Sequence, residues 1–401
     1  MRAKHACGSA RNGLGIGTRI FATPNGACQR RWGCTLGLAV ALLIAARPAQ
    51  AQLADGALDI HGFGGWAYGI TNANQYLAGT PSGNYETAEF SLNVAARLPQ
   101  NITVIAQVAW DDNAQGPVTA LDYAFAQWRA SDWLAFRAGV IKQPFGIYTE
   151  LFDVGTIRPF LFLPQAVYGP AGFVSIAFKG IGIQGSRPIP SGWRIGYDVY
   201  AGGIDVPEDK AGFDILTNDT TDAQGVEVEP TTNVVGGRLR LVAPWGFEAG
   251  VSAFTGRGHE GTAMYSAYVV GSHVEYLSDR WWIRSEFAHE TEVGHSGSTG
   301  WYLEPAYFVT RHWQAALQYD RSWTTLVGTT AVDAPSLLSH EEFAVGLNYY
   351  VTTGFVLKLS SHWVNGNRLA HPPDDGLDAT IDGGGLQRNT RLLQFGTDFS
   401  F

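Results

Sequence analysis

The sequence predicts an all-β fold: one 16-stranded antiparallel transmembrane β-barrel, with short turns at one end, long loops at the other and the third loop folded inward. Apolar and polar residues alternate with period two through most of residues 52–401, as in strands that bury one face only. Short turns alternate strictly with long polar connections. No segment after the N-terminal leader offers the run of about 18 apolar residues of a membrane helix, so a membrane-spanning chain of this kind must be a closed barrel.

The N-terminal leader has the features of a secretory signal. Arg30 and Arg31 precede an apolar run over residues 36–46, and Ala49-Gln50-Ala51 supplies small residues for cleavage. The apolar run is too short for a transmembrane helix, which needs about 20 residues. We therefore expect a signal peptide that is cleaved after Ala51.

Removal of residues 1–51 would leave residues 52–401 as a single barrel domain. The leader holds seven Lys and Arg and no acid, so the remaining chain carries 20 basic and 36 acidic residues, a net charge of −16. We expect no nucleic-acid partner, and this acidity gives no global support for a net positive lumen. All three cysteines also lie in the leader, and without them the barrel has neither a cysteine nucleophile nor a thiolate metal site.

Two neighbouring runs near the start and the final run show the alternation. In "NYETAEFSLNVAARL" (84–98), Phe90 and Leu92 share one face while Glu89 lies on the other, and "NITVIAQVAWDD" follows after a tight turn. The chain ends "RLLQFGTDFSF", with Phe401 on the apolar face. A terminal aromatic beside the hydrated carboxylate indicates an interface.

Turns and loops fix the strand number. The seven short turns, in order, are LPQN near 100, SD at 131, IPSG near 190, APWG near 245, SDR near 279, TRH near 311 and TTG near 353. The eight long connections cover approximately 71–84, 112–120, 142–172, 204–231, 256–263, 291–299, 324–339 and 366–387. With both chain ends on the short-turn side, this pattern gives 16 strands, as in bacterial outer-membrane barrels with short periplasmic turns and long external loops.

Aromatic residues add support for a membrane barrel, because such barrels carry aromatic girdles at both interfaces. We expect the girdles to include Trp66 and Tyr68, Trp281 and Trp282, Trp301 and Tyr302, Tyr349 and Tyr350, and Trp363. The alternative is a soluble all-β protein secreted to the periplasm, either a β-helix or a pair of sandwiches. Neither requires the alternation of short and long connections.

Motifs for catalysis are not found. "HEGTA", "HETEV" and "HEEFA" each lack the second histidine of a zinc-protease helix, and "GHSGS" lies in a Gly/Ser loop without a strand-to-helix turn. The acidic stretch 205–229 could bind calcium, but it lacks the spacing and glycine of a binding loop, which favours a solvated external loop. We therefore expect no enzyme activity, no cofactor and no metal.

The segment Phe136–Gly172 contains the longest of these loops and is unusually apolar for an exposed connection. In a barrel of this size the lumen is a water-filled channel, and we expect the loop to fold into it and narrow it. The alternative is that the loop packs outward over a neighbouring subunit. The constriction candidates are Lys142, Tyr148, Glu150, Asp153 and Arg158.

Strand alternation also places charges toward the lumen. The predicted lumenal bases are Arg137, Lys179, Arg194, Arg238, Arg240, Arg284 and Arg388. The predicted lumenal acids are Glu89, Asp111, Asp198, Glu275, Glu286 and Asp398. The mixture suggests a transverse field across a solute channel. For each charge, an ion pair that stiffens the wall is the alternative role.

The loop region resembles the phosphate-selective porins of the O and P type, through Arg137-Ala-Gly, Lys142-Gln-Pro-Phe-Gly, Tyr148-x-Glu150 and Arg158-Pro-Phe. This resemblance implies a homotrimer of 16-stranded channels in which the third loop enters the pore, and a terminal Phe401 that the barrel-assembly machinery reads. The family's phosphate channels line the pore with an arginine ladder and a lysine cluster. This chain departs from that pattern, since only four lysines follow the leader.

Together these features predict a bacterial outer-membrane porin, a passive water-filled channel for small hydrophilic solutes and ions, surrounded by outer-membrane lipid and lipopolysaccharide. One alternative is an anion- or phosphate-selective porin that binds its solute through the lumenal arginines and lysines. Another is a barrel enzyme or adhesin that acts through its external loops.

Overall fold

The computed structural model describes residues 57–112, 117–169, 173–175, 177–204, 231–260, 263–327, 335–370 and 386–401. The predicted signal peptide and the acidic stretch 205–229 lie outside these residues. No helix within the described ranges is long and apolar enough to cross a membrane.

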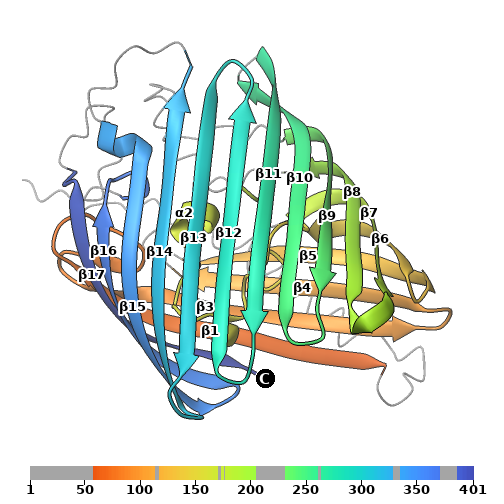
Figure 1. The fold of residues 1–401 in the computed structure, drawn as a ribbon, viewed down its shortest axis with the longest axis horizontal. Coiled ribbons are helices and arrows are strands. Elements are labelled where there is room, and N and C mark those ends of the chain that lie inside the picture. The colour runs from red at the N-terminus through yellow and green to blue at the C-terminus, as the bar shows by residue number, and fades with distance from the viewer. Residues whose placement is uncertain are drawn as a thin grey trace, which may run out of the picture. The chain divides into compact units, whose positions relative to one another are not determined.

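The described residues form one antiparallel sheet of 16 long strands (Figure 1). The long strands are β1 (Leu58–Thr71), β3 (Asn84–Leu98), β4 (Ile102–Asp112), β5 (Val118–Ser131), β6 (Leu134–Lys142), β7 (Ala177–Pro188), β8 (Arg194–Ile204), β9 (Thr231–Val242), β10 (Phe247–Glu260), β11 (Ala263–Leu277), β12 (Trp281–Glu292), β13 (Ser296–Phe308), β14 (Trp313–Leu326), β15 (Ser339–Thr352), β16 (Phe355–Asn365) and β17 (Asn389–Ser400). The short elements are β2 (Gly79–Thr80), α2 (Gln165–Tyr168) and the 3₁₀ turns η1 (Gly155–Ile157), η2 (Pro190–Gly192) and η3 (Pro335–Leu338).

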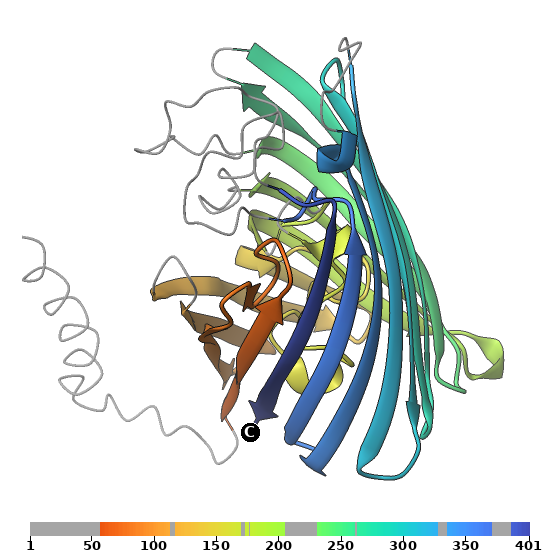
Figure 2. The same ribbon diagram turned by 90° about the vertical axis from the view of Figure 1, so that its left-hand side faces the viewer.

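The sheet closes on itself because the first strand pairs with the last. β1 pairs with β17 from Phe63 opposite Ser400 to Thr71 opposite Leu392, and its other edge pairs with β3. Figure 2 shows the orange β1 beside the dark blue β17. The Phe401 backbone extends this seam, since its N–H donates to Gly62 O at 3.0 Å and its carbonyl accepts from Gly62 N–H at 3.1 Å. The predicted 16-stranded barrel is confirmed.

All seven predicted turns join consecutive strands at the same end of the barrel. Two of the eight predicted long loops are wrong. Only residues 261–262 separate β10 from β11, and only residues 293–295 separate β12 from β13. The strands continue through segments that the sequence analysis assigned to loops, because polar and glycine-rich residues such as those of "SGSTG" (296–300) still pair across the sheet.

The two faces of the barrel differ as the alternation predicts. In β16, Lys358 and His362 on the inner face are buried, while Leu359 and Trp363 on the outer face are exposed. Outer aromatic rings also pair next to the short turns. Their ring centroids lie 4.6 Å apart for Trp281 and Tyr307, 4.8 Å for Trp313 and Tyr349, and 5.5 Å for Trp128 and Phe136. Such a band is typical of a membrane interface.

Part of the predicted girdle is wrong. Adjacent aromatic residues on a strand cannot share a face, because successive side chains point to opposite sides of a sheet. Tyr302 and Tyr350 are buried on the inner face, and Trp282 packs against an inner cluster that contains Phe160. Their neighbours Trp281, Trp301 and Tyr349 occupy the outer face.

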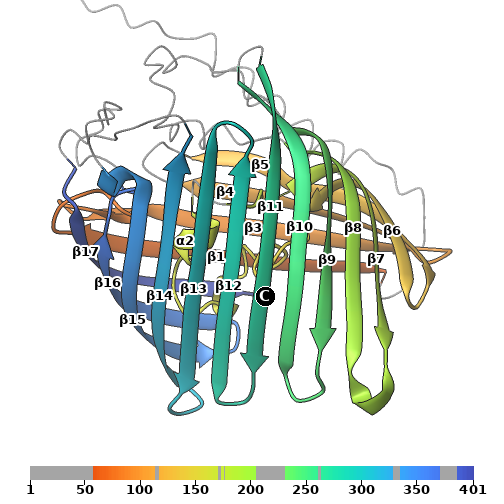
Figure 3. The ribbon, with the colours of Figure 1, turned by 45° about the horizontal axis from the view of Figure 1, so that its top comes forward.

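The third external loop lies inside the barrel and supplies much of its core. Phe145, Tyr148, Val167 and Phe173 of the loop are buried together with wall residues such as Tyr302. Figure 3 shows α2, which belongs to this loop, beside the inner side of β13 and β14. A loop this apolar stays ordered because it buries its side chains against the wall.

Candidate pore constriction

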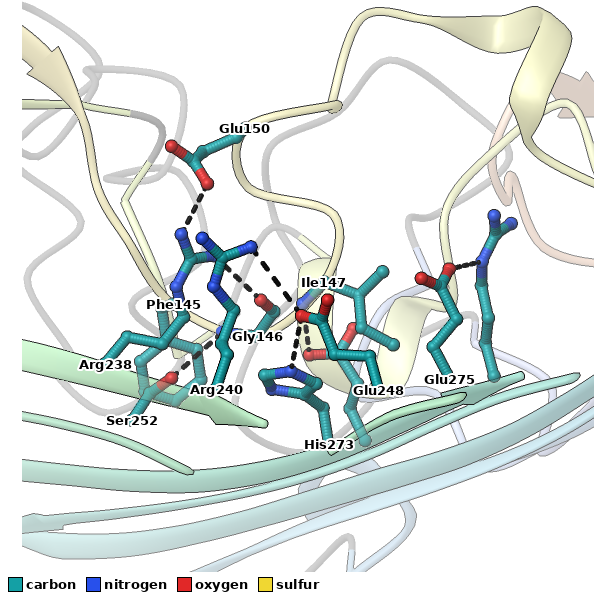
Figure 4. Close-up of polar contacts among 12 residues, drawn as sticks. Phe145, Gly146, Ile147, Glu150, Arg238, Arg240, Glu248, Ser252, His273 and Glu275 are labelled. Atoms are coloured by element: carbon teal, nitrogen blue, oxygen red, sulfur yellow. Dashed lines mark hydrogen bonds and ion pairs between the residues drawn. The ribbon is translucent and has the colours of Figure 1, made fainter. Parts of the chain in front are cut away.

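The loop enters the lumen through a tight turn at Gly146 (Figure 4). Gly146 has φ +56°, in the left-handed region that other residues avoid, and an added Cβ would lie 1.8 Å from Glu286 Oε2. Its N–H donates to Ser252 Oγ at 3.2 Å, and the next N–H, of Ile147, donates to Glu286 Oε2 at 3.0 Å. Glycine is therefore required where the loop meets β10 and β12.

Glu150 and Arg238 hold the next part of the loop. Arg238 Nη2 contacts Glu150 Oε2 and lies 3.0 Å from Asp198 Oδ2, while its Nη1 donates to Gly146 O at 3.1 Å. Arg137 Nη1 lies 3.7 Å from the other Glu150 oxygen. Burial alone would raise the pKa of Glu150. The positive charge of Arg238, with a smaller contribution from Arg137, has the larger effect and lowers this pKa to about 2. Glu150 is therefore ionised at neutral pH.

Tyr148 lies at the centre of a second anchor. Its hydroxyl donates to Glu304 Oε1 at 2.6 Å and accepts from Arg284 Nη1 at 2.8 Å. Arg284 Nε donates to Glu275 Oε1 at 2.7 Å, and its Nη1 also donates to Ile157 O at 2.9 Å. A single wall arginine thus holds both the side chain and the backbone of the loop.

Lys142 and Asp153 form a third anchor near the external end of β6. Lys142 Nζ lies 2.6 Å from Asp153 Oδ2 and 3.1 Å from Asp122 Oδ2, and Gln107 Nε2 donates to Asp153 at 2.6 Å. Burial raises the pKa of Asp153, but the Lys142 ammonium outweighs burial and lowers it below the usual aspartate value. The loop is therefore tied to the β4–β6 wall as well.

Arg158 connects the loop to the closing seam of the barrel. Its Nη2 lies 3.0 Å from Glu89 Oε1 on β3 and 3.8 Å from Asp398 Oδ1 on β17. Its Nη1 also donates to Phe152 O at 3.2 Å within the loop. The guanidinium thus joins strands on both sides of β1.

Lys358 holds the loop backbone beside that seam. Its Nζ lies 2.6 Å from Asp398 Oδ2 and donates to Gly155 O at 2.8 Å and to Phe160 O at 2.9 Å. Lys358 and Asp398 are both almost fully buried. Lys358 is one of the four lysines that follow the leader, and the sequence pattern alone assigns it no role. Alternation places it inward, but only the docked loop brings the two carbonyls to it.

Within three of these ion pairs, the acid is the more exposed partner. The exposed fractions of the basic and acidic side chains are 5% and 40% for Arg158 and Glu89, 2% and 30% for Arg238 and Glu150, and 7% and 23% for Lys142 and Asp153. The bases lie against the wall and the loop, and the carboxylates face water. In other pairs the base is the more exposed partner, with 31% and 22% for Arg240 and Glu248, which lie 3.7 Å apart, and 61% and 31% for Arg97 and Asp59.

The remaining predicted charges are placed as follows. Arg194 and Asp111 lie on the inward face by strand alternation, and both are exposed. Arg388 immediately precedes β17 and donates to Asn365 Oδ1 at 2.9 Å. The prediction for Lys179 is wrong. It is exposed on the outer face with Ile181, because the buried Phe178 sets the opposite parity.

All five constriction candidates contact inward-facing wall residues, so the loop packs inside the barrel and not over its outer surface. Glu304 and Asp122 were not singled out from the sequence, although strand alternation could have placed Glu304 inward. Asp122 lies at a bulge, where the register between β4 and β5 shifts, and simple parity fails there.

The sequence matches no protein-family model and no curated protein. Solved structures match the fold over most of the chain. OmpF of Salmonella typhi, in complex with daunomycin, has a TM-score of 0.55 at 10% identity and covers 86% of this chain and 97% of its own. The anion-selective porin from Comamonas acidovorans has a TM-score of 0.52 at 12% identity and covers 86% of this chain and 99% of its own. The outer membrane channel DcaP of Acinetobacter baumannii has a TM-score of 0.54 at 9% identity and covers 86% of this chain and 97% of its own. The chain therefore has the fold of outer-membrane porins.

Proposed function

We propose that the protein is an outer-membrane porin, a passive water-filled channel through which small hydrophilic solutes and ions diffuse down their gradients. The observation that carries this proposal is the contrast between the two faces of one closed barrel. Exposed Leu, Phe and Trp side chains cover the outside, whereas ion pairs and polar side chains line the inside together with a loop. This arrangement suits a wall between lipid and water.

The exposure of the ion pairs supports a weak preference for cations. A permeating ion interacts with charges that face the water, and in three pairs the solvent-facing member is Glu89, Glu150 or Asp153. The partner arginines and the lysine are already neutralised and covered. An anion- or phosphate-selective pore needs bases that face the solute. Arg194 and Arg240 are such bases, but the exposed members of the three pairs at the internal loop are acids, so this alternative has less support.

Loop residues 142–160 would set the size limit of the channel, because they carry the anchors that hold the loop across the lumen. The family resemblance adds a homotrimer, insertion by the barrel-assembly machinery through Phe401, and a surrounding of outer-membrane lipid and lipopolysaccharide. A signal peptide over residues 1–51 would direct export.

The reversal potential of the refolded protein in a planar bilayer under a KCl gradient tests this function. We expect stable conductance with near-neutral or modest cation preference. Strong anion preference would refute the proposed selectivity and favour the phosphate-type pore, and a complete lack of conductance would refute the channel. Deletion of residues 148–160 should raise single-channel conductance if the loop narrows the pore.

A further inference from the structure

A group of acids and histidines lies on the inner wall away from the ion pairs described above. Asp320 on β14, His340 and Glu342 on β15, and His362 on β16 are all almost fully buried. Asp320 pairs directly opposite Glu342, while His340 lies across from Ser322. The motif "HEEFA" lacks the second histidine of a helical metal site, but on a strand its His340 and Glu342 share one face.

The donor atoms of three residues have the spacing of metal ligands. His340 Nε2 lies 2.9 Å from Asp320 Oδ1 and 3.4 Å from Glu342 Oε2. One donor atom from each of the three residues lies within 4.8 Å of the others. Zinc bonds of about 2.0–2.2 Å in a tetrahedral arrangement place ligand atoms about 3.3–3.5 Å apart, so a small adjustment of the side chains would suffice.

The two acidic side chains of the cluster also favour binding of a cation. Asp320 and Glu342 are carboxylates directly opposite each other on adjacent strands, which is unfavourable without a positive partner. His362 Nδ1 contacts Glu342 Oε1, and its Nε2 lies 2.8 Å from Ser360 Oγ. A divalent cation between the two carboxylates would remove the repulsion between them.

His340 presents its two ring nitrogens differently. Its Nδ1 is buried and has no hydrogen-bond partner among the described residues. Its Nε2 faces both carboxylates, and it is the ring atom that would bind a metal ion in place of its hydrogen bond to Asp320.

We propose that Asp320, His340 and Glu342 bind a divalent first-row transition metal, of which Zn²⁺ is the representative, inside the barrel. One imidazole and two carboxylates form a mixed nitrogen and oxygen donor set that suits such ions. His362 positions Glu342 from the second shell of the site, and Tyr76 donates to Glu342 Oε2 from the first external loop. This site revises the expectation that the chain binds no metal.

Metal binding would also stabilise the internal loop. The N–H of Gln165, at the start of α2, donates to the second Asp320 oxygen at 3.1 Å. The ring of Phe160 packs edge-on against His362, with centroids 5.9 Å apart. The ligands contact the third loop through Gln165 and the first external loop through Tyr76. A bound ion would therefore restrain these two loops together with the β14–β16 wall. The site is independent of the channel activity proposed above.

Isothermal titration calorimetry with Zn²⁺ on tag-free refolded protein, pretreated with EDTA, tests the proposal. We expect one site per chain, a rise in Tm with Zn²⁺, and visible Co²⁺ absorption with an imidazole and carboxylate ligand set. His340→Gln and Asp320→Asn should each weaken Zn²⁺ binding at least a hundredfold. His362→Gln should weaken it by about tenfold to a hundredfold, the range for second-shell partners.

His273→Gln is the matched control, because His273 is also buried on the inner wall and lies 3.4 Å from a carboxylate oxygen of Glu248. It should bind Zn²⁺ like the wild type. Wild-type affinity in folded His340→Gln, or an equal loss in His273→Gln, would overturn the proposal. If the cluster variants fail to fold, the wild-type protein still tests the proposal: the absence of both Zn²⁺ heat and a Tm shift would overturn it.

Discussion

The anchor at Lys358 gives the most quantitative prediction. Lys358→Met keeps a side chain of similar length but removes the ammonium that contacts Asp398 at 2.6 Å and two loop carbonyls at 2.8 and 2.9 Å. Among the described residues, Asp398 would keep only Arg158 as a basic partner, at 3.8 Å. Loss of one partner of a buried ion pair costs about 3–5 kcal/mol. We expect no larger loss of stability, because water in the lumen can hydrate the two loop carbonyls once the ammonium is gone.

A loss of this size lowers the equilibrium constant for loop docking by roughly two to three and a half orders of magnitude. Urea unfolding of protein in lipid vesicles measures the loss in stability, and single-channel recording measures the docking, with frequent transitions to higher conductance as the expected result. The double variant Lys358→Met/Asp398→Leu leaves neither charge without its partner. Its loss in free energy of unfolding should therefore be at least about 1 kcal/mol smaller than the sum of the losses in the two single variants.

Lys179→Met is the matched control, because Lys179 is exposed on the outer face. It should change the free energy of unfolding by no more than about 0.5 kcal/mol. A Lys358→Met protein with wild-type stability and steady wild-type conductance would refute the reasoning that a buried wall lysine holds the loop.

Three further predictions concern the loop and the charges near it. The Glu150 anchor should be fully formed above pH 4.5, the ordinary pKa of a glutamate, and should weaken as the pH falls toward about 2, its pKa in the folded protein; channel recordings across this range check it, and Glu150→Gln should reduce the pH dependence, with the Asp153 anchor contributing the remainder. Gly146→Ala should destabilise the barrel by roughly 1–3 kcal/mol, measured by urea unfolding, because the methyl group collides with Glu286; a value near zero would contradict the turn geometry. Glu89→Gln should shift the reversal potential toward anions, whereas an unchanged potential would show that the exposed acid does not influence permeating ions.

Much of the architecture could be predicted because its signals are local. Pro99, Trp245 with its neighbouring Pro and Gly, and the other turn residues mark one end of each hairpin, and alternation then fixes which face is apolar. The external ends were harder, since "SGSTG" has loop composition but pairs as a strand in β13. Lys179 was misassigned because "AFKGIGIQGSRP" has glycines where polar residues would normally mark the inner face.

The contacts of the candidate site could be predicted only in part. Alternation brings Arg238 and Arg284 inward, and the unusual composition of the loop indicates that it packs against something. Which wall residue meets which loop atom depends on strand register and on the path of the loop, neither of which has a local signal. For the same reason, the cluster of Asp320, His340 and His362 is invisible in the linear sequence, since its members come from three strands.

The position of Arg158 has a consequence for how the chain is assembled. Its partners Glu89 and Asp398 lie on the strands that flank β1, where the two ends of the sheet meet. β17 therefore supplies one acidic partner for a loop residue that lies far earlier in the chain. The contact between Arg158 and Asp398 requires β17 to be in place beside β1, so this part of the docked loop depends on closure of the sheet.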